Sequence, residues 1–251
     1  MAVPADTGQR QWAERLLREA AAHIHALYPD LSIDEQQAAD YPAPALHAAS
    51  KTSQLLVLGS RGVSGFTGFL VGSVALHVVA QAECPVVLVR VRTEGQEEHS
   101  TDAANHGAGT TPYGDVVIGI DLDHPSDETI AFAYEAARLR GTGIQFVHAY
   151  TPPPIHAVGV GAASGPEVAA ARKQVLAAVA RQWQDKFPDV TTTRSFTEGR
   201  AAPQLLQAAT GASLLVLGRR RRHSPTGLHN GPIAHAIMHH APCPVAVVPH
   251  D

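Results

Sequence analysis

Residues 55–73 read Leu-Leu-Val-Leu-Gly-Ser-Arg-Gly-Val-Ser-Gly-Phe-Thr-Gly-Phe-Leu-Val-Gly-Ser. The first four predict a buried strand, and the residues after them form a glycine-rich loop that leads into a helical pattern. Glycine permits φ > 0 and close approach, so such a loop can turn several main-chain N–H groups toward one anion, and the helix start adds partial positive charge. The stretch therefore predicts a phosphate site. Its candidate residues are Gly59, Gly62, Gly72 and Ser73, with Arg61 either clamping a phosphate or lying in solvent.

The chain contains an internal repeat. Leu55-Leu-Val-Leu-Gly59 returns as Leu214-Leu-Val-Leu-Gly218, an offset of 218 − 59 = 159. Residues 41–90 and 200–249 align at this offset without a gap, with 19 identities in 50 pairs. Two homologous domains in tandem explain this similarity. We expect them at residues 1–92 and 114–251, joined by a polar linker at 93–113.

The second copy shows a complete alternation of strands and helices. The predicted strands are 115–121, 144–150, 190–197, 214–217 and 245–248, and the predicted helices are 126–140, 167–187, 201–210 and 233–240. Such alternation is typical of a doubly wound, mostly parallel α/β sheet with right-handed crossovers, so we expect a Rossmann-like fold.

The first copy begins in the middle of this plan, because its helix at 10–27 corresponds to the one at 169–186 and no β-α-β unit precedes it. The predicted strands 33–37 and 55–58 thus lack the neighbouring strand that should join them. Each main-chain amide left buried and unpaired lowers the free energy of unfolding by about 1–3 kcal/mol. A misplaced start codon, a cut chain, or completion of the sheet by another chain would each account for this. We favour the first, and we expect a destabilised or swapped N-terminal half.

Composition narrows the class of protein. Of 251 residues, 45% are hydrophobic and only 5% aromatic, so the core must be aliphatic. A net charge of −4 argues against nucleic-acid binding by the whole chain. The sequence has no apolar run of about 18 residues and no signal pattern, so we expect no membrane span. Two distant cysteines, Cys84 and Cys243, fit core packing in a reducing cytoplasm.

With its repeat, the sequence resembles the tandem universal stress proteins of the UspA-like family. The spacing Gly59-x2-Gly62-x9-Gly72-Ser73 matches that family's ATP-binding pattern, and Ile-Gly-Ile-Asp at 118–121, Val-His-Ala at 147–149 and Cys-Pro-Val before the last strand are further marks. The resemblance implies an adenine nucleotide α-hydrolase-like fold, ATP or AMP as ligand, a regulatory role in stress or dormancy, and homodimers. It implies that the last strands, 86–90 and 245–248, pair at the domain edges.

The resemblance also assigns residues in the second copy. It implies that Asp121, at the end of the first strand, lies near the ribose and adenine, and that the main chain at Ala149 contacts adenine. The counterparts of Gly59 and Gly72 are Gly218 and Gly231.

The second glycine loop departs from the pattern. Arg221 stands where the first copy has Gly62, and Pro232 replaces Ser73. An arginine side chain opposes close approach of the main chain, and proline gives up an N–H and a hydroxyl. Neither copy then carries a whole site, and we expect weak or no nucleotide binding in the second.

Other residues allow two interpretations each. Arg219–Arg222 suggest an anion or nucleic-acid contact, but we favour an exposed loop. His235 and His239 have a spacing that can bind zinc or nickel, but we favour ordinary surface histidines. We expect His148 to be a satisfied core histidine, and Trp12 and Trp183 to pack.

The motifs of ATP-cleaving enzymes are missing from the first loop. No lysine follows it, no acidic residue within 59–73 would place Mg²⁺, and the Gly-x-Ser-x-Gly elbow is absent. We therefore expect a nucleotide-binding regulatory protein with at most slow ATP hydrolysis. The competing interpretation is a nucleotide-free protein-interaction module of the same fold, and a weaker one is a true α-hydrolase enzyme.

Overall fold

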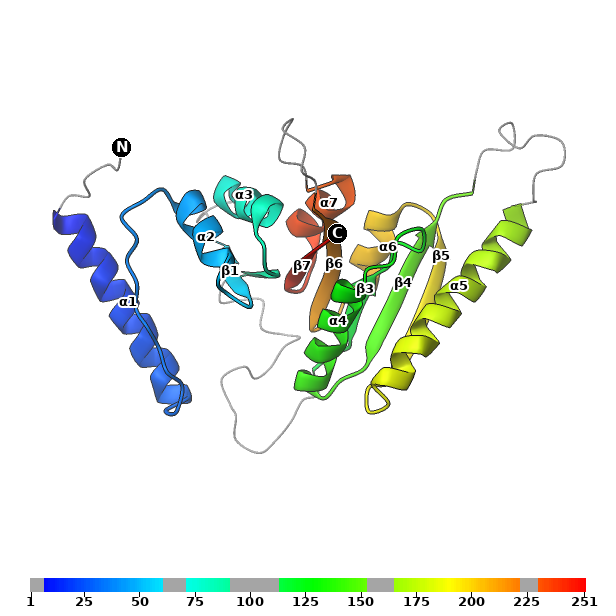
Figure 1. Cartoon of the computed structure of the whole chain (residues 1–251), viewed down its shortest axis with the longest axis horizontal. Helices are drawn as coiled ribbons and strands as arrows, with labels where there is room; N and C mark the ends of the chain where they lie inside the picture. The colour runs from blue at the N-terminus through cyan, green and yellow to red at the C-terminus, as the bar shows by residue number, and fades with distance from the viewer. Residues whose placement is uncertain (1–6, 61–70, 91–112, 153–164, 222–229) are drawn as a thin grey trace.

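The computed structural model describes residues 7–60, 71–90, 113–152, 165–221 and 230–251 (Figure 1). Its elements in chain order are α1 (Thr7–Leu27), α2 (Pro42–Ser50), β1 (Leu56–Ser60), α3 (Ser73–Gln81), β2 (Val86–Arg90), β3 (Val116–Gly119), α4 (Asp127–Arg140), β4 (Ile144–Tyr150), α5 (Gly165–Lys186), β5 (Thr192–Glu198), α6 (Ala201–Ala208), β6 (Leu214–Arg220), α7 (Pro232–His240) and β7 (Val245–His250). We call residues 7–90 the N-terminal segment and residues 113–251 the C-terminal segment. The predicted linker, up to residue 112, lies outside the described residues.

The strands form one sheet in the order β1-β2-β7-β6-β3-β4-β5. All neighbours are parallel except β2 and β7, which run antiparallel with Val87 opposite Ala246. The pairing of the last strands of the two copies is thereby confirmed within one chain. The consequence is a mixed seven-stranded sheet, in which the carboxyl ends of the N-terminal strands point opposite to those of the C-terminal strands.

Helices cover both faces of the sheet, and each face has its own apolar core. On one face, α4 and α5 pack through residues such as Ile130, Tyr134 and Trp183. On the other, α3, α6 and α7 pack through residues such as Val78, Leu205 and Ile237. Because the second core takes residues from both segments, the segments share buried apolar surface as well as a sheet.

The C-terminal elements follow the local signals of the sequence closely. The side chain of Ser126 accepts a hydrogen bond from the main-chain N–H of Thr129 and caps α4, and Gly141 ends that helix in the left-handed region with φ 66°. Strand β4 has the predicted bounds, 144–150. Expected strand 190–197 is β5, shifted to Thr192–Glu198.

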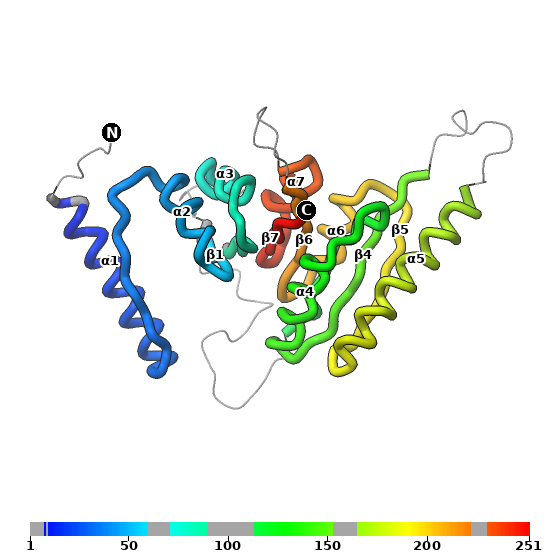
Figure 2. The backbone as a smooth tube through the Cα atoms, in the orientation of Figure 1, coloured from blue at the N-terminus to red at the C-terminus, as the bar shows by residue number. Residues whose placement is uncertain are grey.

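The N-terminal segment departs from expectation. The predicted strand 33–37 is wrong, since these residues form no strand and are exposed. A strand needs a neighbour for its main-chain groups, and among the described strands none lies beside this stretch. Among the described strands, β1 pairs with β2 alone, on one side. Helix α1 and the chain that follows it lie apart from the sheet (Figures 1 and 2). Trp12, predicted to pack, is 51% exposed, whereas Trp183 is buried as expected.

Candidate functional site

A cleft of about 1420 Å³ opens at the carboxyl ends of β3, β4 and β6. Strand β3 comes first in the C-terminal segment. The chain then adds β4 and β5 on one side of β3 and afterwards β6 and β7 on the other side. The cleft therefore lies at the point where the strand order reverses. Open α/β sheets bind ligands at such a point. Its walls include Gly119–Asp121, Val147–Thr151 and Leu217–Arg220.

Five of the nine predicted site residues line this cleft, namely Ser73, Asp121, Ala149, Gly218 and Gly231. Gly59 and Gly72 are not among its described lining residues, and Arg61 and Gly62 lie outside the described part of the chain. Among the residues that the structure describes, a Cβ added at Gly59 or Gly72 would meet nothing within 4 Å, and Gly72 has φ −62°. Packing against the described residues therefore does not require these two glycines, and their role toward phosphate stays a prediction.

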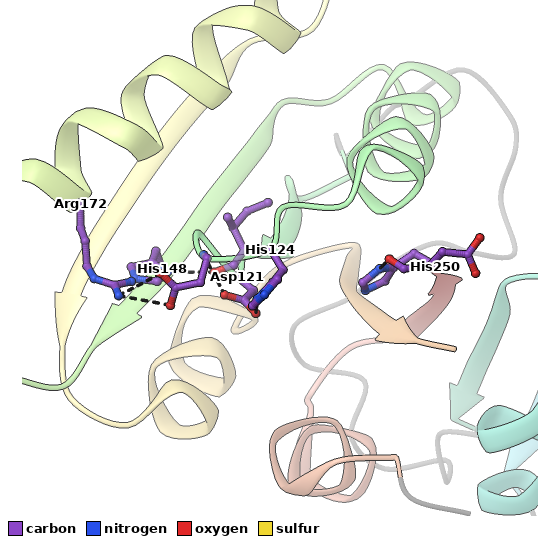
Figure 3. A network of polar contacts seen from close by, with 8 residues as sticks. Asp121, His124, His148, Arg172 and His250 are labelled. Atoms are coloured by element: carbon purple, nitrogen blue, oxygen red, sulfur yellow. Dashed lines mark hydrogen bonds and ion pairs between the residues drawn. The ribbon is translucent and has the colours of Figure 1, made fainter. Parts of the chain in front are cut away.

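Asp121 lies at the end of β3 with its carboxylate exposed to the cleft (Figure 3). Its Oδ1 accepts a hydrogen bond of 3.0 Å from the main-chain N–H of Asp123, and its Oδ2 lies 3.6 Å from Nδ1 of His124. The Asp123 carboxylate in turn accepts from Nη2 of Arg172 at 3.0 and 3.2 Å. The turn after β3 thus fixes Asp121 while leaving it free to accept from ligand hydroxyls.

His148 on β4 is only half satisfied, contrary to expectation. Its Nδ1 lies 2.9 Å from the main-chain oxygen of Ile120, so Nδ1 carries the proton. The side chain is buried, with 7% of the residue exposed, and its Nε2 has no partner in the structure. Because His148 lines the cleft, this nitrogen is a buried polar group at the wall that a ligand would contact.

Gly218 is explained by packing. A Cβ at this position would lie 2.9 Å from Nε2 of His250 and 2.9 Å from Oγ1 of Thr129. Any side chain would therefore displace the residues that form the floor beside β6. At Gly231 the backbone conformation explains the glycine, because a φ of 70° at the start of α7 favours this residue type.

The arginines after Gly218 do not form the exposed loop that we expected, and for Arg219 this prediction is wrong. Its guanidinium is half-buried and donates to the main-chain oxygens of Ala80 and Ala82 at 3.0 and 2.6 Å. Arg221 donates to the oxygen of Glu83 at 3.2 Å. Both side chains satisfy carbonyls at the end of α3, where cations are favoured.

Arg221 was predicted to obstruct the second site. It is not one of the residues that line the cleft, because its guanidinium reaches Glu83 and Asp251 instead. Arg222 lies outside the described residues. The departure from Gly62 therefore does not by itself close the cleft.

Sequence reasoning missed several lining residues, including Arg172, Thr129, Asn230 and His250. They come from α5, α4, the start of α7 and the end of β7, and no local motif marks them. They come together only in the folded chain, whereas Asp121 could be assigned beforehand from the family resemblance.

Within the described residues, no group of three or more His, Cys, Asp or Glu is arranged to hold a metal ion. His235 and His239 have ring centroids 4.5 Å apart, and Nδ1 of His239 accepts from the main-chain N–H of Val71. Cys84 and Cys243 are buried and form no disulfide. No helix in the described part of the chain is long and apolar enough to cross a bilayer.

Comparison with known proteins identifies the family. The model of the universal stress protein family matches residues 2–90 and 112–249. The chain belongs to the universal stress protein family. Universal stress protein Rv2005c of Mycobacterium tuberculosis (strain H37Rv) is 30% identical over 220 residues, which cover 86% of this chain and 69% of that protein.

Solved structures agree on the fold. A universal stress protein from Archaeoglobus fulgidus DSM 4304 superposes with a TM-score of 0.70 at 17% identity, covering 100% of this chain and 85% of its own. Another family member, from Archaeoglobus fulgidus, has been solved in complex with dAMP; it is 22% identical, with a TM-score of 0.39, and covers 55% of this chain and 98% of its own.

Proposed function

We propose that the chain is a regulatory universal stress protein that binds an adenine nucleotide, ATP or AMP, in the cleft of its C-terminal segment. The observation that carries the proposal is that the ends of β3, β4 and β6 gather Asp121, Ala149 and Gly218 around one cleft. We also propose that the two segments are tandem domains of the family's fold. The nucleotide found in a family member supports the choice of ligand.

The positions of the lining residues indicate how the nucleotide is oriented in the cleft. The base and ribose lie at the β3–β4 side, where the carboxylate of Asp121 accepts from ribose hydroxyls and the main chain at Ala149 contacts adenine. The phosphates lie toward Gly218 and Gly231, near the exposed Arg220. This places the negative end of the nucleotide away from the carboxylates of Asp121 and Asp123.

The cleft is built for binding more clearly than for catalysis. Its carboxylates, Asp121 and Asp123, are engaged by His124 and Arg172 in the turn after β3. We propose ATP turnover that is slow or absent, and a signal carried by occupancy. Mg²⁺ can accompany bound ATP, but we propose no residue of the cleft as its ligand.

Ligand analysis of the purified protein tests the proposal. Mass spectrometry after denaturation should detect ATP or AMP, and calorimetry should show ATP and AMP binding more tightly than GTP. Asp121→Ala should weaken binding about tenfold, the worth of a charge-assisted hydrogen bond. Asp185→Ala, which changes an exposed carboxylate on α5, is the matched control. Absence of binding for every adenine nucleotide would instead favour the interaction module.

A further inference from the structure

One wall of the cleft belongs to the other segment. Besides the strand ends of the C-terminal segment, Ser73, Leu76 and His77 of α3 line the cleft. They lie on one face of that helix, since residues three and four apart are neighbours on a helix surface. The cleft thus spans both copies of the repeat.

The antiparallel pairing of β2 with β7 explains this wall. It brings α3 beside α7 (Figure 1), and the two hydrogen bonds described next show that the helices run in opposite directions. The main-chain N–H of Val71 donates to Nδ1 of His239 at 3.3 Å near one end of the pair. Near the other end, Nδ2 of Asn230 donates to the main-chain oxygen of Leu76 at 3.0 Å. Since Leu76 precedes His77, this second contact fixes the lining face of α3 against the start of α7.

Two further contacts hold α3 in place. Arg219 donates to the oxygens of Ala80 and Ala82, at the end of α3 that points away from Ser73. Arg219 directly follows Gly218, which lines the cleft. It therefore links this strand end to α3, which also lines the cleft. The C-terminal end of α3 is therefore tied to the end of β6.

The α3 wall supplies what the start of α7 lacks. Pro232 at the first turn of α7 has no N–H to offer an anion. Ser73 and His77 of α3 line the same cleft as Pro232 and offer a hydroxyl donor and an imidazole, and His235 and Arg220 line it too. The carboxylates of Asp121 and Asp123 belong to the end of β3, two strands away from β7 in the sheet. The N-terminal segment thus adds two side chains to the cleft that can donate to phosphate oxygens, whereas the two lining carboxylates are held by His124 and Arg172 after β3.

The cleft is larger than a typical small-molecule pocket, so a ligand has room to contact α3 as well. Small-molecule pockets are typically about 300–1,000 Å³, and the cleft measures about 1420 Å³. This volume has room for a nucleoside with two or three phosphates, and both Ala149 and the α3 residues line it.

We propose that α3 of the N-terminal segment completes the phosphate end of this cleft, with Ser73 and His77 selecting nucleoside di- and triphosphates over monophosphates. The inference rests on the proposed function, because it assigns a specificity to the same nucleotide site. Residues of both copies then form the site together, so a chain with two incomplete copies can carry one complete site.

Calorimetry with AMP, ADP and ATP tests this inference on the full chain. The double variant Ser73→Ala/His77→Ala should weaken ATP about tenfold and ADP about fivefold, and AMP less than twofold. His25→Ala, which removes an exposed histidine of α1, should change none of the three affinities. Undiminished AMP binding shows in the same experiment that the variant is folded.

The outcomes separate the two proposals. If AMP and ATP bind and the double variant weakens both equally or neither, the role of α3 is wrong while the nucleotide site stands. If no adenine nucleotide binds to the unaltered chain, both proposals fail. A loss of affinity that grows with the number of phosphates supports the shared cleft.

Discussion

Arg219 donates a hydrogen bond of 2.6 Å from Nη2 to the main-chain oxygen of Ala82, across the boundary between the two segments. A second bond, from Nη1 to the oxygen of Ala80, measures 3.0 Å. These carbonyls terminate α3, where a helix carries partial negative charge. Burial lowers the pKa of Arg219, and the nearby charge of Arg221 lowers it further. The side chain stays cationic at neutral pH, because arginine is not deprotonated in proteins.

Arg219→Met should lower the free energy of unfolding by about 1–3 kcal/mol, because two carbonyls lose charged donors while the aliphatic stem keeps its packing. Urea denaturation measures this, and hydrogen exchange should show faster opening of α3. Arg194→Ala, at an exposed arginine of β5, is the control and should shift stability by less than about 0.5 kcal/mol. Equal effects of the two variants would contradict a specific clamp.

Gly59 and Gly218 occupy equivalent positions of the repeat, but their surroundings differ. Gly218→Ala brings a Cβ to 2.9 Å from both His250 and Thr129, and should cost about 1–3 kcal/mol in overpacking. Gly59→Ala meets nothing within 4 Å and should change stability by less than about 0.5 kcal/mol. Urea denaturation of both variants is the measurement. A large loss for Gly59→Ala would show that its space is occupied.

Local signals predicted the C-terminal half well, because each element there has its neighbours. Ser126 and Gly141 cap α4 as their residue types suggest, and β4 has the expected bounds. Asp121 and Ala149, which the family resemblance assigned to the site, both line the cleft. The ends of parallel strands meet at one edge of such a sheet, which brings the two residues together.

The failures have a common physical cause, namely contacts distant in sequence. The stretch 33–37 was expected to be a strand, but among the described strands none lies beside it to complete a ladder. Arg219 looks like part of a solvated run until α3 of the other copy supplies the carbonyls it binds. The α3 wall could not be predicted from either copy alone, because it depends on the antiparallel β2–β7 pair.

The two tryptophans should report separately on the two segments. Trp12 on α1 is 51% exposed, whereas Trp183 is 6% exposed and stacks near Tyr134 and Phe187. Iodide should therefore quench only part of the fluorescence. Trp12→Phe should remove the quenchable, red-shifted component and leave the buried one. Strong quenching of the emission that remains in Trp12→Phe would mean that Trp183 is not buried, and a Trp12 that iodide cannot quench would mean that α1 is covered in solution.

Tyr134 provides a test at alkaline pH. Its hydroxyl lies 2.8 Å from Oγ1 of Thr192 inside the α4–α5 core, and burial raises the pKa of its phenol above the ordinary value of 10.0. The hydrogen bond to Thr192 opposes this rise without cancelling it. The unfolded chain therefore releases the proton first, so the stabilisation by neutral Tyr134 is full below pH 10 and is lost as pH rises through the folded-state pKa.

Tyr134→Phe should accordingly reduce the loss of stability at high pH. At pH 8 the variant should be about 1 kcal/mol less stable, since it lacks the hydrogen bond to Thr192. Between pH 8 and pH 10.5 its free energy of unfolding in urea should fall less than that of the unaltered chain. Tyr28→Phe, at an exposed tyrosine, is the control and should keep the unaltered slope. Identical slopes for the unaltered chain and Tyr134→Phe would mean that the phenol ionises as readily in the folded core as in water, which a buried hydroxyl among Phe146, Trp183 and Phe187 should not do.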